Sequence, residues 1–530
     1  PPNPLTLWYP KPATMTTVEN KWMEYSLPIG NGHLGACLFG GAYCDELQFN
    51  EKSLWSGAST VGGDHGYYQN FGSVYVIDES NEFSLTATSP RPNKYVRFLD
   101  IEDGGAGVNF THSTDGGQYY RRYFSSEPDD VIAAHYVAPE GHKLAFQVSY
   151  YPGENLNNSR PVYADGYGEF HGKLGLLSYN TQLRVVPVGE GATLTEDEMG
   201  IHVANADEVL VLLSAKTDYD GTNMSTFTNG ETPEQLHADI RKNLDNAAAK
   251  GWERLLADHT ENFHSYMDRV KLNLNTGTLD AASTKTTEAL VTYYNQSSSN
   301  PKTKDGLFLE QLYFQYGRYL GISCSRGSLP VPSNLQGLWN DKASAPWHSD
   351  IHTNINVQMN YWPMEPTNLS ECHMPYLDYI INMVNSPGWK QAASNSGNPG
   401  WTVYTESNIF GGTSTWGNHE MKTLGAWYCT HLWRYYKYTM DRQFLRRALP
   451  VMYQNALFTA SIATRDAQGL YEIQNEFSPE HGPYDVTAFA QQTSYEVLDA
   501  ILKLFDYIAT PEGDTLLSFG IENVHYELDE

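Results

Sequence analysis

The sequence lacks the features of several specialised protein classes. Its 530 residues contain 5 cysteines, and none of them belongs to a Cys-x-x-Cys pair or to a His/Cys pattern typical of a metal site. Because the number is odd, at least one thiol is free, so a disulfide framework does not hold the fold together. No apolar run is long enough to span a membrane. These absences predict a protein with no metal or other cofactor and no membrane insertion.

Basic residues are also scarce. The chain has 34 Lys and Arg against 62 Asp and Glu, a net charge of −28 that repels phosphate backbones and argues against nucleic acid as a partner. Aromatic residues make up 13%, which suits a protein that handles carbohydrate, although large secreted β domains have similar compositions. No charged-then-apolar leader precedes Pro1, and we expect an extracellular or periplasmic protein whose signal peptide has been removed.

Three regions follow one another along the chain. Residues 1–230 alternate short apolar runs with Gly, Asn and Asp turns, which predicts an antiparallel β-sandwich. Residues 231–280 carry apolar side chains at helical intervals after Pro233, which predicts a helical linker. Residues 281–530 alternate apolar helices with long connections rich in Gly, Pro, Asn and Trp. This last pattern predicts a toroid of helix hairpins whose loops gather at one end.

The stretch 334–362 has an unusual composition for a protein core. It holds 3 tryptophans, 2 histidines and 5 asparagines in 29 residues. Amides and imidazoles bind hydroxyl groups, and indoles cover the apolar face of a sugar ring. Two interpretations are open. The stretch is either a carbohydrate site, or a loop in which Asn354 and Asn356 cap helix ends while the tryptophans fill a core.

Glu480 is the first candidate for a general acid. It lies between helical runs and is framed by Pro479 and Gly482, and a dry environment there would raise the pKa of the carboxyl toward neutrality. The alternative is a helix start in which Ser478 is the cap and Glu480 lies in the first turn. Glu476 is a less firmly framed competitor.

A hydrolytic pair also needs a group that orients water. Asn354 and Asn356 are candidates, but an amide is a very poor base and needs a nearby carboxylate to take up charge. Asp350, Asp341 and Glu365 are candidates for that carboxylate, and the local sequence does not choose between them.

Long motifs along the chain resemble those of one enzyme family. They lie at residues 7–57, 95–101, 119–135, 334–340 (NLQGLWN), 350–363 (DIHTNINVQMNYWP), 425–433 (GAWYCTHLW) and 478–482 (SPEHG). In this order they resemble glycoside hydrolase family 95, over nearly everything from residue 5 to about 500. The resemblance implies an N-terminal β-sandwich, a helical linker and an (α/α)6 barrel that holds the site.

The same resemblance implies an activity and catalytic residues. Members of the family are inverting α-L-fucosidases that release terminal α-1,2-linked L-fucose from glycans without a cofactor, and some are α-L-galactosidases. By resemblance, Glu480 is the general acid, and Asn354 and Asn356 hold the water that attacks the opposite face of the sugar. Inversion requires room for that water, about 6.5–9.5 Å between the two groups.

The resemblance also assigns three residues to substrate binding. His352 is expected near C6 of the sugar, where fucose carries a methyl group. Family members with threonine at this position are associated with L-galactose, so the histidine favours fucose. Trp427 is expected to form a wall of the sugar site, and Trp362 to contribute to substrate binding.

The sequence departs from the family pattern near its end. The family barrel continues past this length and supplies an Arg-His pair and an Asp in a DGNFG-like motif, which this sequence does not contain. After about Phe505, the last 26 residues resemble the tail of a sugar-transport substrate-binding protein. We therefore expect an incomplete barrel in a truncated or chimeric chain.

Two other functions stay open for that reason. The chain would bind fucose or a related sugar without hydrolysing it if nothing activates the water. A transport-associated sugar receptor is a third hypothesis, although residues 1–500 lack the alternating β and α pattern such a receptor needs.

Overall fold

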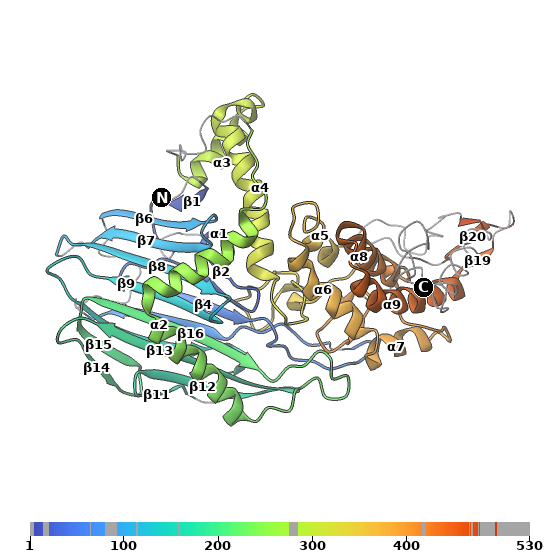
Figure 1. The fold of residues 1–530 in the computed structure, drawn as a ribbon, viewed down its shortest axis with the longest axis horizontal. Coiled ribbons are helices and arrows are strands. Elements are labelled where there is room, and N and C mark those ends of the chain that lie inside the picture. The colour runs from blue at the N-terminus through green and yellow to red at the C-terminus, as the bar shows by residue number, and fades with distance from the viewer. Residues whose placement is uncertain are drawn as a thin grey trace, which may run out of the picture.

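A computed structural model shows an N-terminal region of antiparallel sheets followed by a helical region, as the sequence predicts (Figure 1). The structure describes residues 5–13, 21–63, 65–79, 93–112, 115–156, 160–274, 285–415, 420–465, 467, 470–474, 476 and 493–494.

Nine strands form the first sheet, and all neighbouring strands run antiparallel. Their order is β1 (Thr6–Tyr9), β6 (Asn93–Asp100), β7 (Gly105–Thr111), β8 (Gln118–Ser126), β9 (Val131–Val137), β16 (Glu208–Thr217), β13 (Leu177–Val188), β12 (Tyr167–Leu174) and β11 (Val162–Ala164).

Seven strands form the second sheet, which is also antiparallel. Their order is β14 (Thr193–Glu196), β15 (Ile201–Ala206), β10 (Leu144–Pro152), β5 (Gly72–Asp78), β4 (Cys44–Glu51), β3 (Leu34–Leu38) and β2 (Leu27–Gly30).

Strand β9 is apolar on both faces because both faces are covered. Ile132 and Ala134 point into the core that the two sheets share. Val131 and Ala133 point the other way, into a cluster with helix α2 (Pro233–Met267). Side chains alternate along a strand, so a continuous apolar run indicates a strand buried on both sides.

Helix α2 lies across the first sheet and corresponds to the helical linker that the sequence predicts (Figure 1). Thr232 and Gln235 form a capping box at its start, where the Thr232 hydroxyl accepts from the Gln235 amide at 3.3 Å. Gly251, with φ 72°, kinks the helix in a conformation that suits glycine. The apolar side chains that α2 buries against the sheet include Ile240, Leu244, Ala247 and Leu255.

The helical region begins with α3 and α4, which rise away from the sheets, and continues with α5–α9, which lie beyond one end of the sheets (Figure 1). The helices other than α2 are α1 (Lys21–Tyr25), α3 (Thr287–Gln296), α4 (Lys304–Cys324), α5 (Asn356–Tyr361), α6 (Ser370–Met383), α7 (Pro387–Ser394), α8 (Leu424–Thr439) and α9 (Arg442–Ile462), with 3-10 turns η2 (Glu154–Leu156), η3 (Asn300–Lys302) and η4 (Pro346–Ser349). Short strands are β17 (Glu406–Ser407), β18 (Thr413–Ser414), β19 (Thr464–Arg465), β20 (Leu470–Glu472) and β21 (Thr493–Ser494). Closure into a toroid and boundaries at 230 and 280 stay predictions.

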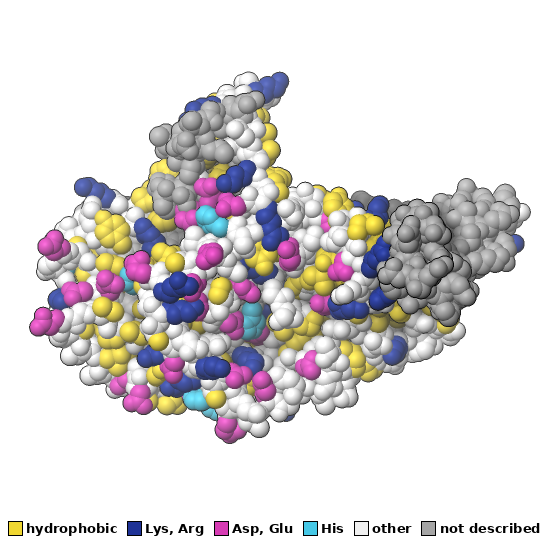
Figure 2. Space-filling model, in the orientation of Figure 1, with side chains coloured by type: hydrophobic (Ala, Val, Ile, Leu, Met, Phe, Trp, Pro, Cys, Tyr) yellow, Lys and Arg dark blue, Asp and Glu magenta, His cyan; other side chains and the backbone are white. Residues whose placement is uncertain are grey.

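None of the helices in the described part combines the length and apolarity needed to cross a membrane. Acidic and basic side chains intersperse over the visible face of the sheet region (Figure 2).

Candidate active site

The segment 334–340 fixes the start of the candidate site to the sheet region. The Trp339 indole donates to the Ile29 carbonyl at 2.9 Å, and the Tyr68 hydroxyl donates to the Leu338 carbonyl at 2.6 Å. Trp339 is buried, as the core-filling alternative predicts, but Trp347 and Trp362 are 53% and 38% exposed. Trp339 therefore fits the core-filling interpretation, whereas Trp347 and Trp362 fit the interpretation as a carbohydrate site.

The next part of the chain, residues 350–353, runs beside residues 405–407, and a turn at residues 353–355 follows. The Ile351 amide donates to the Ser407 carbonyl at 2.9 Å, and the Thr353 amide donates to the Thr405 carbonyl at 2.7 Å. Ile351 and Thr353 are fully buried, and the Thr353 hydroxyl lies 2.9 Å from that of Tyr428 on α8. Because side chains alternate along an extended segment, Asp350 and His352 share the face opposite Ile351, and Asn354 follows in the turn that leads into α5.

Asp350 and His352 form a hydrogen-bonded pair on that face. His352 Nδ1 donates to the two carboxylate oxygens of Asp350 at 3.0 and 3.2 Å. The Asp350 side chain is fully buried, whereas 10% of the His352 side chain is exposed. Burial raises the pKa of Asp350 to about 7; the bond from His352 opposes this rise, and the nearby Glu406 adds to it. The hydrogen bond to Asp350 therefore fixes the orientation of the His352 imidazole.

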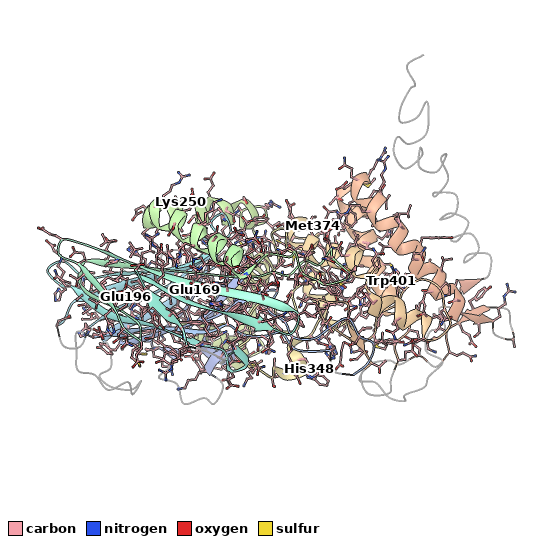
Figure 3. All side chains as sticks on the ribbon, turned by 90° about the horizontal axis from the view of Figure 1, so that it is seen from below. Glu169, Glu196, Lys250, His348, Met374 and Trp401 are labelled. Carbon is pink, nitrogen blue, oxygen red and sulfur yellow. The ribbon has the colours of Figure 1, made fainter. Side chains whose placement is uncertain are left out.

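A histidine from the sheet region reaches the same group of side chains. His65 Nε2 lies 3.0 Å from His348 Nδ1 and 3.9 Å from the Asp350 carboxylate. On its other side, His65 Nδ1 lies 3.8 Å from Glu406, whose carboxylate accepts from the Ser414 hydroxyl at 2.7 Å. Figure 3 places His348 between the sheet region with Glu169 and the helical region with Trp401.

These contacts could not be found from the sequence. His65 and His348 are 283 residues apart, and neither lies in a local pattern that predicts the other. Glu406 is likewise brought to the site only by the pairing of β17 with the 350–353 segment. The one local signal is the spacing of Asp350 and His352, which an extended segment places on one face.

Asn354 presents an amide whose oxygen has no partner within the described structure. Its side chain is 7% exposed, and Oδ1 is buried without a hydrogen bond. Asn356 is half-buried at the first position of α5. The helix-capping alternative is wrong for α5, because Ile355 occupies the cap position and no side chain caps this end. A buried amide oxygen without a partner can accept a hydrogen bond from a ligand, so Asn354 is a candidate for a ligand-binding group.

The other two predicted carboxylates differ in their contacts. Glu365 accepts from His373 Nδ1 at 2.6 Å, and His373 Nε2 lies 3.0 Å from His431 Nδ1. Burial lowers the pKa of His431 to about 2, so this ring is neutral. Asp341 is half-buried near the surface of the 340–345 loop, and burial raises the pKa of its carboxyl.

Glu476, the competitor for the general acid, is bound to the start of α8. Its carboxylate accepts from the backbone amides of Lys422 at 3.0 and 3.1 Å and of Thr423 at 3.3 Å. The positive end of the helix dipole favours an anion at this position. Burial raises the pKa of Glu476, and these hydrogen bonds offset part of the rise. Glu476 is thus a structural anchor, while Glu480 lies outside the described residues.

The two tryptophans assigned to substrate binding lie on neighbouring helices. Trp362 follows the last residue of α5. Trp427 is partly buried on the first turn of α8, next to Tyr428, whose hydroxyl contacts Thr353. Within the described residues, no group of three or more His, Cys, Asp or Glu side chains is arranged to hold a metal ion.

Comparison with known families shows what the two regions of the chain are similar to. The helical region is similar to glycoside hydrolase family 95. Residues 251–508 match the model described as "Glycosyl hydrolase family 95 catalytic domain". Residues 7–63 and 58–222 match "Glycosyl hydrolase family 65, N-terminal domain".

Two relatives and one solved structure extend this comparison. The chain is 29% identical to "Alpha-L-fucosidase 2" of Arabidopsis thaliana, over 89% of this chain and 61% of the relative. It is 28% identical to "Probable alpha-fucosidase A" of Aspergillus niger, over 97% of this chain and 68% of the relative. The structure named "Putative kojibiose phosphorylase from human microbiome" has a similar fold, with a TM-score of 0.66 and 11% identity over 97% of this chain and 66% of that one. The chain thus spans about three fifths of the Arabidopsis relative.

Proposed function

We propose that the protein binds the terminal α-L-fucose of α-1,2-fucosylated glycans and releases it with inversion. The observation that carries this proposal is the buried Asn354 amide oxygen, which has no hydrogen-bond partner among the described residues and lies two residues after His352 of the Asp350–His352 pair. An amide and an oriented imidazole are suited to binding the hydroxyl groups of a neutral sugar. The names of the two relatives support fucose as that sugar.

The proposed roles follow the family resemblance of these residues. Asn354 and Asn356 hold the attacking water, and Glu480 protonates the glycosidic oxygen from the other face of the sugar. His352 lies at C6 and favours fucose over L-galactose. Asp350 acts through His352, because its fully buried carboxyl is bonded to that ring.

A sugar-binding protein that does not hydrolyse is the second candidate. It is favoured by the partners of two candidate carboxylates: Asp350 is bonded to His352, and Glu365 is bonded to His373. An amide holds water but is a poor base, so turnover requires a further carboxylate to accept the proton.

Calorimetry with L-fucose and hydrolysis of 2′-fucosyllactose separate the two candidates. Binding with hydrolysis supports the enzyme, binding alone supports the second candidate, and no binding contradicts both. Asn354→Ala should suppress hydrolysis and leave the melting temperature nearly unchanged, because the amide oxygen has no bond to lose.

Asn360→Ala, six residues further along the chain in α5, is the matched control. The Asn360 amide donates to Ser333 Oγ at 3.3 Å and to the Asn334 carbonyl at 3.2 Å. This variant should lower stability by roughly 1 kcal/mol with little loss of turnover per folded molecule. Equal losses of turnover in both variants would remove Asn354 from its proposed role.

A variant of Glu480 tests its proposed role as the general acid. Glu480→Gln should lower turnover roughly 10²–10⁴-fold, the usual contribution of a placed general acid. Glu476→Gln should instead lower stability, because its carboxylate binds the start of α8. Unchanged turnover in Glu480→Gln would exclude that residue as the acid.

A further inference from the structure

Trp347 is a large aromatic side chain that the fold leaves in solvent. Its side chain is 53% exposed, although it lies in the same stretch as the buried Trp339. Its ring contacts His352 edge-to-face, with centroids 6.0 Å apart and planes at 65°. Trp347 is therefore the neighbour, on the solvent side, of the residue proposed to contact C6 of fucose.

The backbone that presents this indole is strained. Trp347, His348 and Ser349 have φ values of 53°, 60° and 48°, and none of them is glycine. Residues other than glycine adopt this left-handed conformation at a cost in conformational energy, and consecutive examples are rare. Strain of this kind persists where the surrounding structure imposes it, which occurs most often at ligand sites.

Contacts from two directions hold the turn in place. The Tyr68 amide of the sheet region donates to the His348 carbonyl at 3.1 Å, and His348 Nδ1 lies 3.0 Å from His65 Nε2. From the other side, the Ser349 hydroxyl donates to Asn334 Oδ1 at 3.0 Å. All these bonds engage the turn backbone or its other side chains, so the fold secures the turn while half of the indole surface faces water.

We infer that the exposed Trp347 indole forms the subsite for the sugar to which the terminal fucose is attached. The inference rests on the proposed function, because it takes the position of the fucose from His352. A pyranose has an apolar face of C–H groups that an indole covers well, and an aromatic contact of this kind adds affinity without directional hydrogen bonds. Trp347 would therefore make the protein prefer fucosylated oligosaccharides over small fucosides.

Trp433 provides a matched control. It is 47% exposed on α8, where its ring lies 5.3 Å from that of Tyr436 on the same helix. The exposure of the two indoles is similar, but Trp433 is not on a left-handed turn and is not in contact with His352. General effects of removing an exposed indole should be equal in the two variants.

The test compares the binding of 2′-fucosyllactose with that of L-fucose by calorimetry. Trp347→Ala should weaken 2′-fucosyllactose binding roughly tenfold more than L-fucose binding, the effect of losing one aromatic contact. Trp347→Tyr should recover most of the difference, and Trp433→Ala should change neither affinity. If the variant is active, KM for 2′-fucosyllactose should rise more than KM for a nitrophenyl fucoside.

A second variant, Trp347→Asn, tests whether misfolding explains a loss of binding. Asparagine adopts the left-handed conformation more readily than tryptophan, so this variant removes the indole while it relieves strain in the turn. It should melt no lower than wild type and show the same selective loss of 2′-fucosyllactose binding. Equal weakening for both ligands, or no weakening, would overturn the inference, whereas a wild-type protein that binds neither ligand would overturn the proposed function itself.

Discussion

Two buried carboxyl groups, one in each region of the molecule, show what separates a structural acid from a functional one. Asp45 lies between the two sheets, accepts hydrogen bonds from the Tyr123 and Tyr136 hydroxyls at 2.5 and 3.0 Å, and lies 3.5 Å from Arg121. Asp350 lies in the helical region and is bonded to the imidazole of His352. Both side chains are at most 1% exposed.

Burial raises the pKa of both carboxyls, so burial does not mark the functional one. The difference lies in their partners. Arg121 and two tyrosine hydroxyls surround Asp45, and such donors keep their protons near neutral pH. Asp350 instead has an imidazole partner and a neighbouring carboxylate, Glu406, and its pKa reaches about 7. Titratable partners beside a buried amide mark the candidate site.

The comparison predicts the largest loss of stability at Asp45. Asp45→Asn leaves the buried Arg121 guanidinium without its counter-charge, which should cost about 3 kcal/mol in the free energy of unfolding. Urea unfolding at pH 7 measures this change. The exposed pair of Asp207 with Lys143 is the control, and Asp207→Asn should cost less than about 1 kcal/mol. Equal costs would show that Asp45 has no special structural role.

A pH-dependent effect is expected at Asp350. The folded-state pKa of about 7 lies above the usual value of about 3.9, so the fold favours the protonated acid. The stability this gives is complete below about pH 4 and is lost as the pH rises to about 7. Asparagine does not titrate, so the stability of Asp350→Asn relative to wild type should rise by up to about 4 kcal/mol over this range.

Melting temperatures of wild type and Asp350→Asn between pH 4 and 8 check that expectation. Asp45→Asn is the comparison, because its cost at pH 7 should remain large at pH 8. A stability difference at Asp350 that is constant with pH would show that this carboxyl is ionised throughout, as in a structural pair.

The smallest effect is expected where the site segment is bound to α8. Tyr428→Phe removes the hydroxyl that lies 2.9 Å from Thr353 Oγ1, which should lower the free energy of unfolding by about 1 kcal/mol. Tyr435→Phe, on the same helix, is the control, since that ring packs against Phe444 and its loss of a hydroxyl should have little effect. A cost as large as that of Asp45→Asn would show that the site segment is as firmly held as the core of the sheets.

The sequence predicts the order of the two regions and the identity of the site segment. The double-faced burial of β9 explains its continuous apolar run, and α2 follows the helical spacing of Ile240, Leu244 and Leu255. The prediction that 334–362 is not an ordinary core holds for Trp347 and Trp362 and fails for the buried Trp339. The difference arises because Ile29 offers a backbone carbonyl to the Trp339 indole, a contact across 310 residues.

What the sequence determined by itself was local: strand and helix periodicity, and the alternation that places Asp350 and His352 on one face. Only the tertiary structure decided that His65 and Glu406 surround that face, and that Glu476 binds the start of α8 instead of a substrate. The physical reason is that periodicity follows from the geometry of neighbouring residues. The environment that sets a carboxyl pKa or leaves an indole exposed depends on side chains brought together by packing from distant parts of the chain.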